Sequence, residues 1–184
     1  MNGFHRDDLL FSLCGLNCGL CPMKLDGYCP GCGGGKGNQS CAIARCSLEQ
    51  GGVAYCSQCA KYPCERYRAD DLYDSFITHR NRRQDLERLQ RIGPAAYQEE
   101  QLEKQVILTN LLNHYNDGRH KGFYYAAANL LPLEDLRTAM EQLAALPPDL
   151  SARERAAQAA GLFQALAGQK GFDLKLRKKP HKPH

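Results

Sequence analysis

The sequence lacks the features that direct a chain into or across a membrane. No apolar run approaches the roughly 18 residues that a transmembrane helix needs, and tryptophan is absent altogether. The opening stretch, MNGFHRDDLLFSLCG, has acidic residues where a secretory signal is basic, and it has no long apolar core. We therefore expect a cytoplasmic protein without membrane contact. In a reducing compartment, clustered cysteines are more often metal ligands than disulfides.

Charge of one sign is also scarce once the end of the chain is set aside. The net charge is +4, but residues 170–184 contain six basic side chains against one acidic side chain, so the rest of the chain is close to neutral. Residues 1–169 therefore lack the excess of positive charge that is typical of a dedicated nucleic-acid-binding protein. Because the tail is basic, zinc-dependent nucleic-acid binding stays an alternative. A hydrophobic fraction of 43% with 24% charged residues excludes a disordered or collagen-like chain.

Cysteine is absent from most of the chain and concentrated in one segment. All ten cysteines lie between Cys14 and Cys64. Three pairs, at positions 18/21, 29/32 and 56/59, have the spacing CxxC, in which a tight turn brings two sulfurs to one metal ion. The pair within CPGC (29–32) has the form of a zinc knuckle. The candidate metal ligands are all ten thiols: Cys14, Cys18, Cys21, Cys29, Cys32, Cys41, Cys46, Cys56, Cys59 and Cys64.

The same segment has few apolar side chains. It contains ten glycines and ten large apolar residues other than cysteine, too few to offset the conformational entropy lost on folding. A folded module of this composition needs cross-links, and we expect metal to supply them. The fold class predicted from the sequence is thus a small, irregular, metal-stapled module with one helix, over about 39–50, followed by an all-α helical bundle.

Helical periodicity begins after Pro63. Apolar residues at three- and four-residue steps, the pair Gly93-Pro94, and a capping box of Ser151 and Glu154 predict a series of helices. The expected helices cover residues 65–74, 76–92, 94–115, 119–130, 133–146 and 151–168. The predicted domains are a cysteine-rich metal-binding module over 1–64, a helical bundle over 65–168, and a basic, disordered tail over 169–184.

Ten thiols accommodate two four-ligand sites with two thiols left over. If cysteines that are adjacent in the sequence share an ion, the four cysteines of 18–32 form one site. The cysteines of 56–64 then form the other site together with Cys41 or Cys46. A grouping in which the two sites interleave along the sequence is equally allowed. Two structural Zn²⁺ ions are the first expectation. The alternative is a redox protein or enzyme accessory with [4Fe–4S] clusters, because all-cysteine ligation without nearby histidine suits them. Disulfides or redox-active thiols are a third interpretation.

Four strings, CGLNCGLCP (14–22), CPGC (29–32), CAIARC (41–46) and CSQCAKYPC (56–64), carry a family resemblance. Together they resemble the cysteine-rich bacterial and archaeal family catalogued as domain of unknown function 3795, over Cys14 to about Arg66. LERLQRIG (86–93) and residues 116–136 also resemble a C-terminal extension of some members. The resemblance implies metal binding by the matched cysteines and no particular reaction. Some relatives end in a further zinc ribbon, where this chain has helices.

Outside the cysteines, no two side chains have the pattern of a nucleophile and its base. We therefore expect a non-catalytic protein that acts as a binding or accessory module for a protein partner. Two polar segments are weaker candidates for a site. The arginine-rich segment 79–91 predicts either a solvated helix face or a face for an anionic ligand. The polar residues 113–121 predict either a capped turn or a ligand site at a helix junction.

Overall fold

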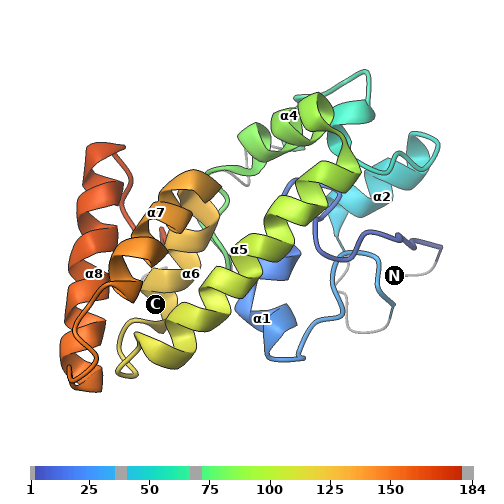
Figure 1. Ribbon diagram of the computed structural model, residues 1–184. Coiled ribbons are helices and arrows are strands. Elements are labelled where there is room, and N and C mark those ends of the chain that lie inside the picture. The colour runs from blue at the N-terminus through green and yellow to red at the C-terminus, as the bar shows by residue number, and fades with distance from the viewer. Residues whose placement is uncertain (1–2, 36–40, 67–71, 180–184) are drawn as a thin grey trace. The chain divides into compact units, whose positions relative to one another are not determined.

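The computed structural model describes residues 3–35, 41–66 and 72–179 (Figure 1). In these ranges the regular structure is entirely helical, with seven α-helices and two short 3-10 helices. The helices are η1 (Cys18–Leu20), α1 (Pro22–Leu25), α2 (Ala42–Glu49), η2 (Cys56–Gln58), α4 (Arg82–Ile92), α5 (Pro94–His114), α6 (Lys121–Leu130), α7 (Leu133–Ala144) and α8 (Ala152–Gln169). None of these described helices is both long enough and apolar enough to cross a membrane.

Local sequence signals account for several helix ends. Gly51 follows α2 with φ of 84°, a conformation that glycine adopts without steric cost. The Ser151 side chain accepts the N–H of Glu154, and the Glu154 carboxylate accepts the N–H of Ser151, which forms the predicted capping box of α8. The helices predicted over 94–115, 119–130, 133–146 and 151–168 are confirmed with small shifts at their ends.

The helix predicted over 76–92 begins later, at Arg82. Before it, the Asp74 carboxylate accepts the backbone N–H of His79 at 2.9 Å, and the Thr78 hydroxyl donates to the same carboxylate. Side-chain bonds of this kind satisfy backbone donors outside a helix and so compete with helix formation. Half of the helix predicted over 65–74 (residues 67–71) falls outside the described residues, and residues 72–74 are not helical. The first two residues of the helix predicted over 39–50 also fall outside the described residues.

The chain separates into two compact units. The first contains residues 1–101 and 176–184, and the second contains residues 102–175, so the division falls within α5. The predicted boundaries lay instead after Cys64 and after Gly168. The first unit therefore includes α4 and the beginning of α5 in addition to the cysteine-bearing residues.

The first unit has an apolar core that does not come from the cysteine segment alone. Its largest group of buried side chains, which we call the aromatic cluster, consists of Phe11, Tyr55, Leu86, Leu89 and Tyr97. The Phe11 ring lies 4.7 Å from that of Tyr97 and 6.0 Å from that of Tyr55, centroid to centroid. Of these five residues only Tyr55 lies between Cys14 and Cys64, so the residues before and after that segment supply its core.

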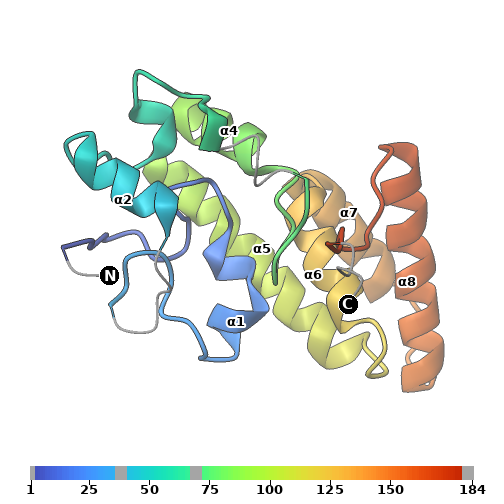
Figure 2. The same ribbon diagram turned by 180° about the vertical axis from the view of Figure 1, so that it is seen from behind.

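This core overturns the predicted fold class, an irregular metal-stapled module with one helix followed by a separate bundle. The described part of residues 1–64 contains two α-helices and two 3-10 helices rather than one helix. It also packs against α4, since Cys56, Tyr62 and Cys64 lie against the aromatic cluster. Helix α4 lies beside η2, at the top of the view in Figure 2. The prediction was wrong because it counted the apolar residues of the segment by itself.

A second group of buried side chains in the first unit, the α2 cluster, consists of Phe4, Leu13, Ile43 and Ala44. Ile43 and Ala44 lie in the first turn of α2, and the other two residues come from the N-terminal segment. Cys14, Cys32 and Cys56 are partly buried against this cluster. Thiols from three different parts of the sequence thus surround one small apolar group.

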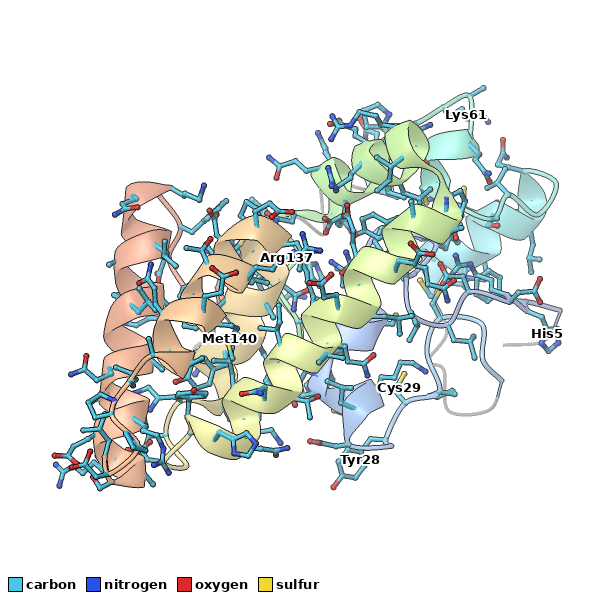
Figure 3. The ribbon with its side chains drawn as sticks, viewed as in Figure 1. His5, Tyr28, Cys29, Lys61, Arg137 and Met140 are labelled. Atoms are coloured by element: carbon cyan, nitrogen blue, oxygen red, sulfur yellow. The ribbon has the colours of Figure 1, made fainter. Side chains whose placement is uncertain are left out.

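In the second unit, α6, α7 and α8 lie side by side (Figures 1 and 2). Helix α6 is buried along most of its length, and its Tyr124 ring meets that of Phe163 edge to face at 6.0 Å. The buried Lys104 ammonium donates to the Leu131 carbonyl at 2.7 Å, which satisfies the end of α6. Arg137 of α7, labelled in Figure 3, pairs with Glu103 at 2.6 Å.

The last residues return to the first unit. Of the tail predicted over 169–184, residues 180–184 lie outside the described range. Arg177 is held by Asp74, whose side chain is fully buried: the carboxylate accepts the Arg177 backbone N–H and its guanidinium, each at 2.9 Å. Burial raises the pKa of Asp74, but the bonds from Arg177 and His79 outweigh burial, so the pKa lies below its usual value.

We expect Asp74→Asn to destabilise the first unit by about 1–3 kcal/mol at pH 7, because charge-assisted bonds to buried groups are lost. A carboxylate whose pKa is lowered by folding stabilises the folded state above its unfolded pKa of about 4, and the stabilisation disappears as the pH falls below that value. Urea unfolding followed by circular dichroism at pH 7 and at low pH measures this. The exposed Asp149→Asn is the control. An equal effect of D74N at both pH values contradicts the assignment.

Candidate metal centre

Four thiols from three parts of the sequence line one pocket in the first unit. Cys46 comes from α2, Cys56 from η2, and Cys59 and Cys64 from the residues after η2. The pocket has a volume of about 30 Å³. Its other lining residues are Ile43, Ser47, Gln50, Val53, Tyr62 and Arg66. We call these four cysteines the pocket thiols.

Local hydrogen bonds explain how the chain brings the pocket thiols together. In η2 the Cys59 N–H donates to the Cys56 carbonyl at 3.0 Å, which closes the turn between the two sulfurs. The Gln58 side chain accepts the two N–H groups that precede the turn. On the other side of the pocket, the Ser47 hydroxyl donates to the Val53 carbonyl at 2.8 Å and so ties α2 to the segment that leads into η2.

Three further thiols, Cys14, Cys18 and Cys32, form a second group, the N-terminal thiols. Burial raises the pKa of Cys18 to about 12, and the nearby thiols of Cys32, Cys14 and Cys21 also raise it. Burial also raises the pKa of Cys14, as do Cys32 and, to a smaller extent, Cys41. Since like charges shift a pKa only at short range, these effects show that the N-terminal thiols are neighbours and that Cys41 lies near them.

Backbone N–H groups point at two of the N-terminal sulfurs. The Cys32 N–H donates to the Cys18 sulfur, and the Leu13 N–H donates to the Cys32 sulfur; each bond lowers the pKa of the thiol that accepts it. Such bonds are the usual second layer around cysteine ligands, where they orient the sulfur and stabilise its negative charge. The N-terminal thiols therefore lie in surroundings that suit thiolates.

Two guanidinium groups accompany these sulfurs. Arg6 donates to the Cys32 sulfur and lowers the pKa of that thiol against the larger effect of burial. The positive charge of Arg82, which is only 2% exposed, lowers the pKa of Cys14. Arg6 is itself fixed by bonds to the Phe11 carbonyl at 2.7 Å and the Asp8 carbonyl at 3.1 Å. Positive charge is thus built in beside the N-terminal thiols, where burial by itself opposes ionisation.

The loop that carries Cys14 and Cys18 is anchored on α4 and α5. Asn17, which is buried, donates to the Asp85 carboxylate at 3.0 Å and accepts the Tyr97 hydroxyl at 2.9 Å. Burial and the nearby Asp85 raise the pKa of Tyr97 well above its usual value, so the hydroxyl stays a donor. A residue between two cysteines thus fixes their loop to the helices that follow.

Cys21 lies near Cys18, because its thiol raises the pKa of Cys18, and Cys29 in turn lies near Cys21. Burial raises the pKa of Cys21, the N–H groups of Met23 and Lys24 in α1 lower it, and Cys29 raises it. Figure 3 labels Cys29 next to Tyr28, whose side chain is 73% exposed and points outward. Adjacent pairing of the four cysteines of 18–32 in one site stays a prediction, as does interleaved pairing.

The thiols gather without forming a finished metal site. Across residues 3–35, 41–66 and 72–179, no three side chains of His, Cys, Asp or Glu are placed as a bound metal ion requires. The ten cysteines, all of them within those ranges, form no disulfide bond. Metal binding therefore requires the sulfurs of a group to move closer together.

The polar segment 113–121 forms a capped turn. The Asn116 amide oxygen accepts the N–H groups of Gly118 and His120, each at 3.1 Å. The Asp117 carboxylate pairs with Arg119 at 2.6 Å and with His120 at 3.0 Å, and the bond from Arg119 in particular lowers the pKa of Asp117 to about 2. The charged groups of the turn thus bind one another.

The arginine-rich segment 79–91 does not form one solvated face. Arg82 is buried, Arg88 pairs with Glu100, and Arg80 approaches Asp74 at 4.0 Å. Sequence reasoning placed Arg82 on a surface and did not single out Arg6 at all. Arg82 lies in the first turn of α4, and the role of its charge can be recognised only when α4 is known to contact the cysteine loop.

Comparison of the chain with protein-family models, with curated proteins and with solved structures gives no match in any of the three. The resemblance to the cysteine-rich family stays a prediction, and the geometry described above is the basis for assigning a function.

Gly15 provides a test of the contact between the cysteine loop and α4. Its φ is +88°, and a Cβ atom there would lie 2.3 Å from the Arg82 carbonyl oxygen. Gly27 has a similar φ of +79° but nothing within 4 Å of its Cβ position. We expect Gly27→Ala to cost about 1–2 kcal/mol of stability from backbone strain alone, and Gly15→Ala to cost clearly more. Chemical unfolding measures both, and equal costs would show that the close approach is not needed.

Proposed function

We propose that this protein is a non-catalytic metal-binding protein that holds two metal ions, most suitably Zn²⁺, through cysteine thiolates. One ion would be held by the four pocket thiols. The other would be held by the three N-terminal thiols and a fourth cysteine near them. The metal supplies cross-links between segments that are distant in the sequence, and the protein serves as a binding or accessory module.

The observation that carries the proposal is the pocket itself. Four sulfurs from α2, η2 and the following turn line one pocket. Four cysteines without histidine or carboxylate are the donor set of a closed structural zinc site, since all positions of a tetrahedral ion are filled by protein. Such a site has no open position for a substrate, which agrees with a structural rather than a catalytic role.

Charge supports the same assignment for the N-terminal thiols. Four thiolates around one Zn²⁺ leave a net charge of −2, which is costly to bury unless positive groups lie nearby. Arg6 and Arg82 supply two positive charges at Cys32 and Cys14. The thiolates of a metal site would balance these two positive charges.

Elemental analysis of the full chain, purified reduced and without oxygen, tests the proposal. We expect a colourless protein with about two zinc ions per chain. Cys59→Ser should lower the content by one ion, whereas Ser57→Ala, a change in the same turn that removes no thiol, should not. A brown protein containing iron and sulfide would replace zinc by the cluster alternative. A protein with no bound metal that also fails to take up added Zn²⁺ would refute metal binding altogether.

Metal removal should also lower the stability of the first unit. A ligand that binds only the folded state stabilises it by about 2.7 kcal/mol at a hundredfold excess over its dissociation constant. We expect chelation to lower the melting temperature and to expose residues 14–64 to protease, and added Zn²⁺ to reverse both. Because the aromatic cluster contributes a core of its own, α4 should keep its helical signal without metal. Unchanged melting after complete chelation would contradict a structural role.

A further inference from the structure

Two large apolar side chains are exposed on one short segment of the first unit. Leu72 and Phe76 are each 64% exposed, although the next residue, Ile77, is only 5% exposed. Single apolar residues scattered over a surface are normal, whereas exposed apolar residues that gather in one place mark contact sites. The segment thus turns Ile77 into the protein and leaves Phe76 in the solvent.

Hydrogen bonds hold this segment in one conformation. The buried Asp74 carboxylate accepts the N–H groups of His79 and Arg177, each at 2.9 Å. The Asp74 N–H in turn donates to the Arg177 carbonyl, also at 2.9 Å, and the Ser75 N–H donates to the carbonyl of residue 77 at 3.1 Å. A surface that is fixed before binding loses less conformational entropy when a partner docks on it.

The same hydrogen bonds bring basic residues to the apolar side chains. Arg177 is bound to Asp74, in the middle of the segment 72–76, and the next two residues are exposed lysines. Asp74 is the one acidic residue in these two stretches of sequence, and its buried charge is matched by Arg177. The exposed charge of the two stretches is therefore positive. We call the following four residues the exposed patch: Leu72, Phe76, Lys178 and Lys179.

The second unit has another pair of exposed apolar residues, but this pair lacks such charge. Leu102 and Val106 of α5 are 45% and 68% exposed, and they line one open pocket with uncharged residues that include Gln105 and Asn110. The charges that specify a partner lie instead in the exposed patch. The pair on α5 therefore provides a control for apolar exposure alone.

We infer that the exposed patch is a docking surface for a protein partner, and that the partner contributes an acidic segment with apolar side chains. Its carboxylates pair with Lys178 and Lys179, and its apolar side chains cover Leu72 and Phe76. Buried aromatic side chains contribute much of the affinity of an interface, and complementary charge selects the partner. The inference rests on the proposed function in one respect, that this protein is a binding module, and it requires no metal ion.

The apolar half of the patch favours a protein over other anionic partners. A nucleic acid offers phosphates to the lysines, but the side chain of Leu72 neither pairs with a phosphate nor stacks on a base as an aromatic ring does. An anionic lipid surface needs a larger apolar area, since even a single myristoyl chain gives only marginal binding. An acidic, apolar peptide uses all four side chains of the patch.

Fluorescence anisotropy of the full, reduced chain with two labelled peptides tests the inference. The probe is the acidic, apolar peptide DEFDELDEFDEL, and the peptide DESDESDESDES has the same charge without apolar side chains. We expect the probe to bind about tenfold more tightly than the second peptide, and to bind more weakly as salt is raised from about 50 to about 500 mM. Equal affinities overturn the inference, as does the absence of binding. Either failure leaves the metal content, measured separately, as the test of the proposed metal sites.

Two pairs of variants locate the binding surface. Phe76→Ser and Lys178→Glu should each weaken binding of the probe about tenfold. Val106→Ser and Arg153→Glu are the matched controls, because each makes the same kind of change at an exposed residue of the second unit. Circular dichroism checks that all four variants are folded. If the controls lose as much affinity as the first pair, the exposed patch is not the docking surface.

Two further probes address the other anionic partners. A labelled DNA single strand of about 20 nucleotides supplies phosphates along a flexible backbone, and vesicles of phosphatidylcholine with phosphatidylserine supply an anionic lipid surface. We expect both to bind more weakly than the acidic, apolar peptide. Tighter binding of either one that is lost in Lys178→Glu overturns the assignment of a protein partner.

Discussion

The first unit depends on the burial of the short segment that precedes the first cysteine. Phe11 lies in the aromatic cluster and Leu13 in the α2 cluster, so alternate residues of one segment enter two separate apolar groups. Between them, the buried Ser12 accepts the N–H of Leu16 at 2.7 Å and contacts the Cys14 sulfur at 3.3 Å. If this segment were displaced, both clusters and the turn that carries Cys14 would lose their support.

This arrangement changes the expected role of metal. A segment with ten glycines and few apolar residues suggested a fold that exists only when metal is bound. The structure supplies apolar partners from outside that segment, above all Leu86 and Leu89 of α4 and Tyr97 of α5. Metal would then add cross-links to a core that is already formed, and these cross-links would fix the loops and α2. Its removal would make the thiol-bearing segments more flexible than the helices around them.

Part of the fold could be predicted from local signals, because those signals act within a few residues. The capping box of Ser151 and Glu154, the glycines after α2 and the turn at Asn116 are satisfied by their own neighbours. The start of α4 could not be predicted in this way. It depends on Asp74, whose carboxylate binds His79 nearby but also Arg177, more than a hundred residues further along the chain.

The sequence by itself determined which residues are candidate ligands, since ten cysteines with three CxxC pairs and no histidine among them limit the chemistry to thiolate sites. Only the tertiary structure decided how they are grouped. Cys46 rather than Cys41 lines the pocket with Cys56, Cys59 and Cys64, and Arg82 lies buried near Cys14. Spacing constrains sulfurs only within one turn of chain, whereas the meeting of distant turns is set by the packing of Phe11, Leu13 and α4 between them.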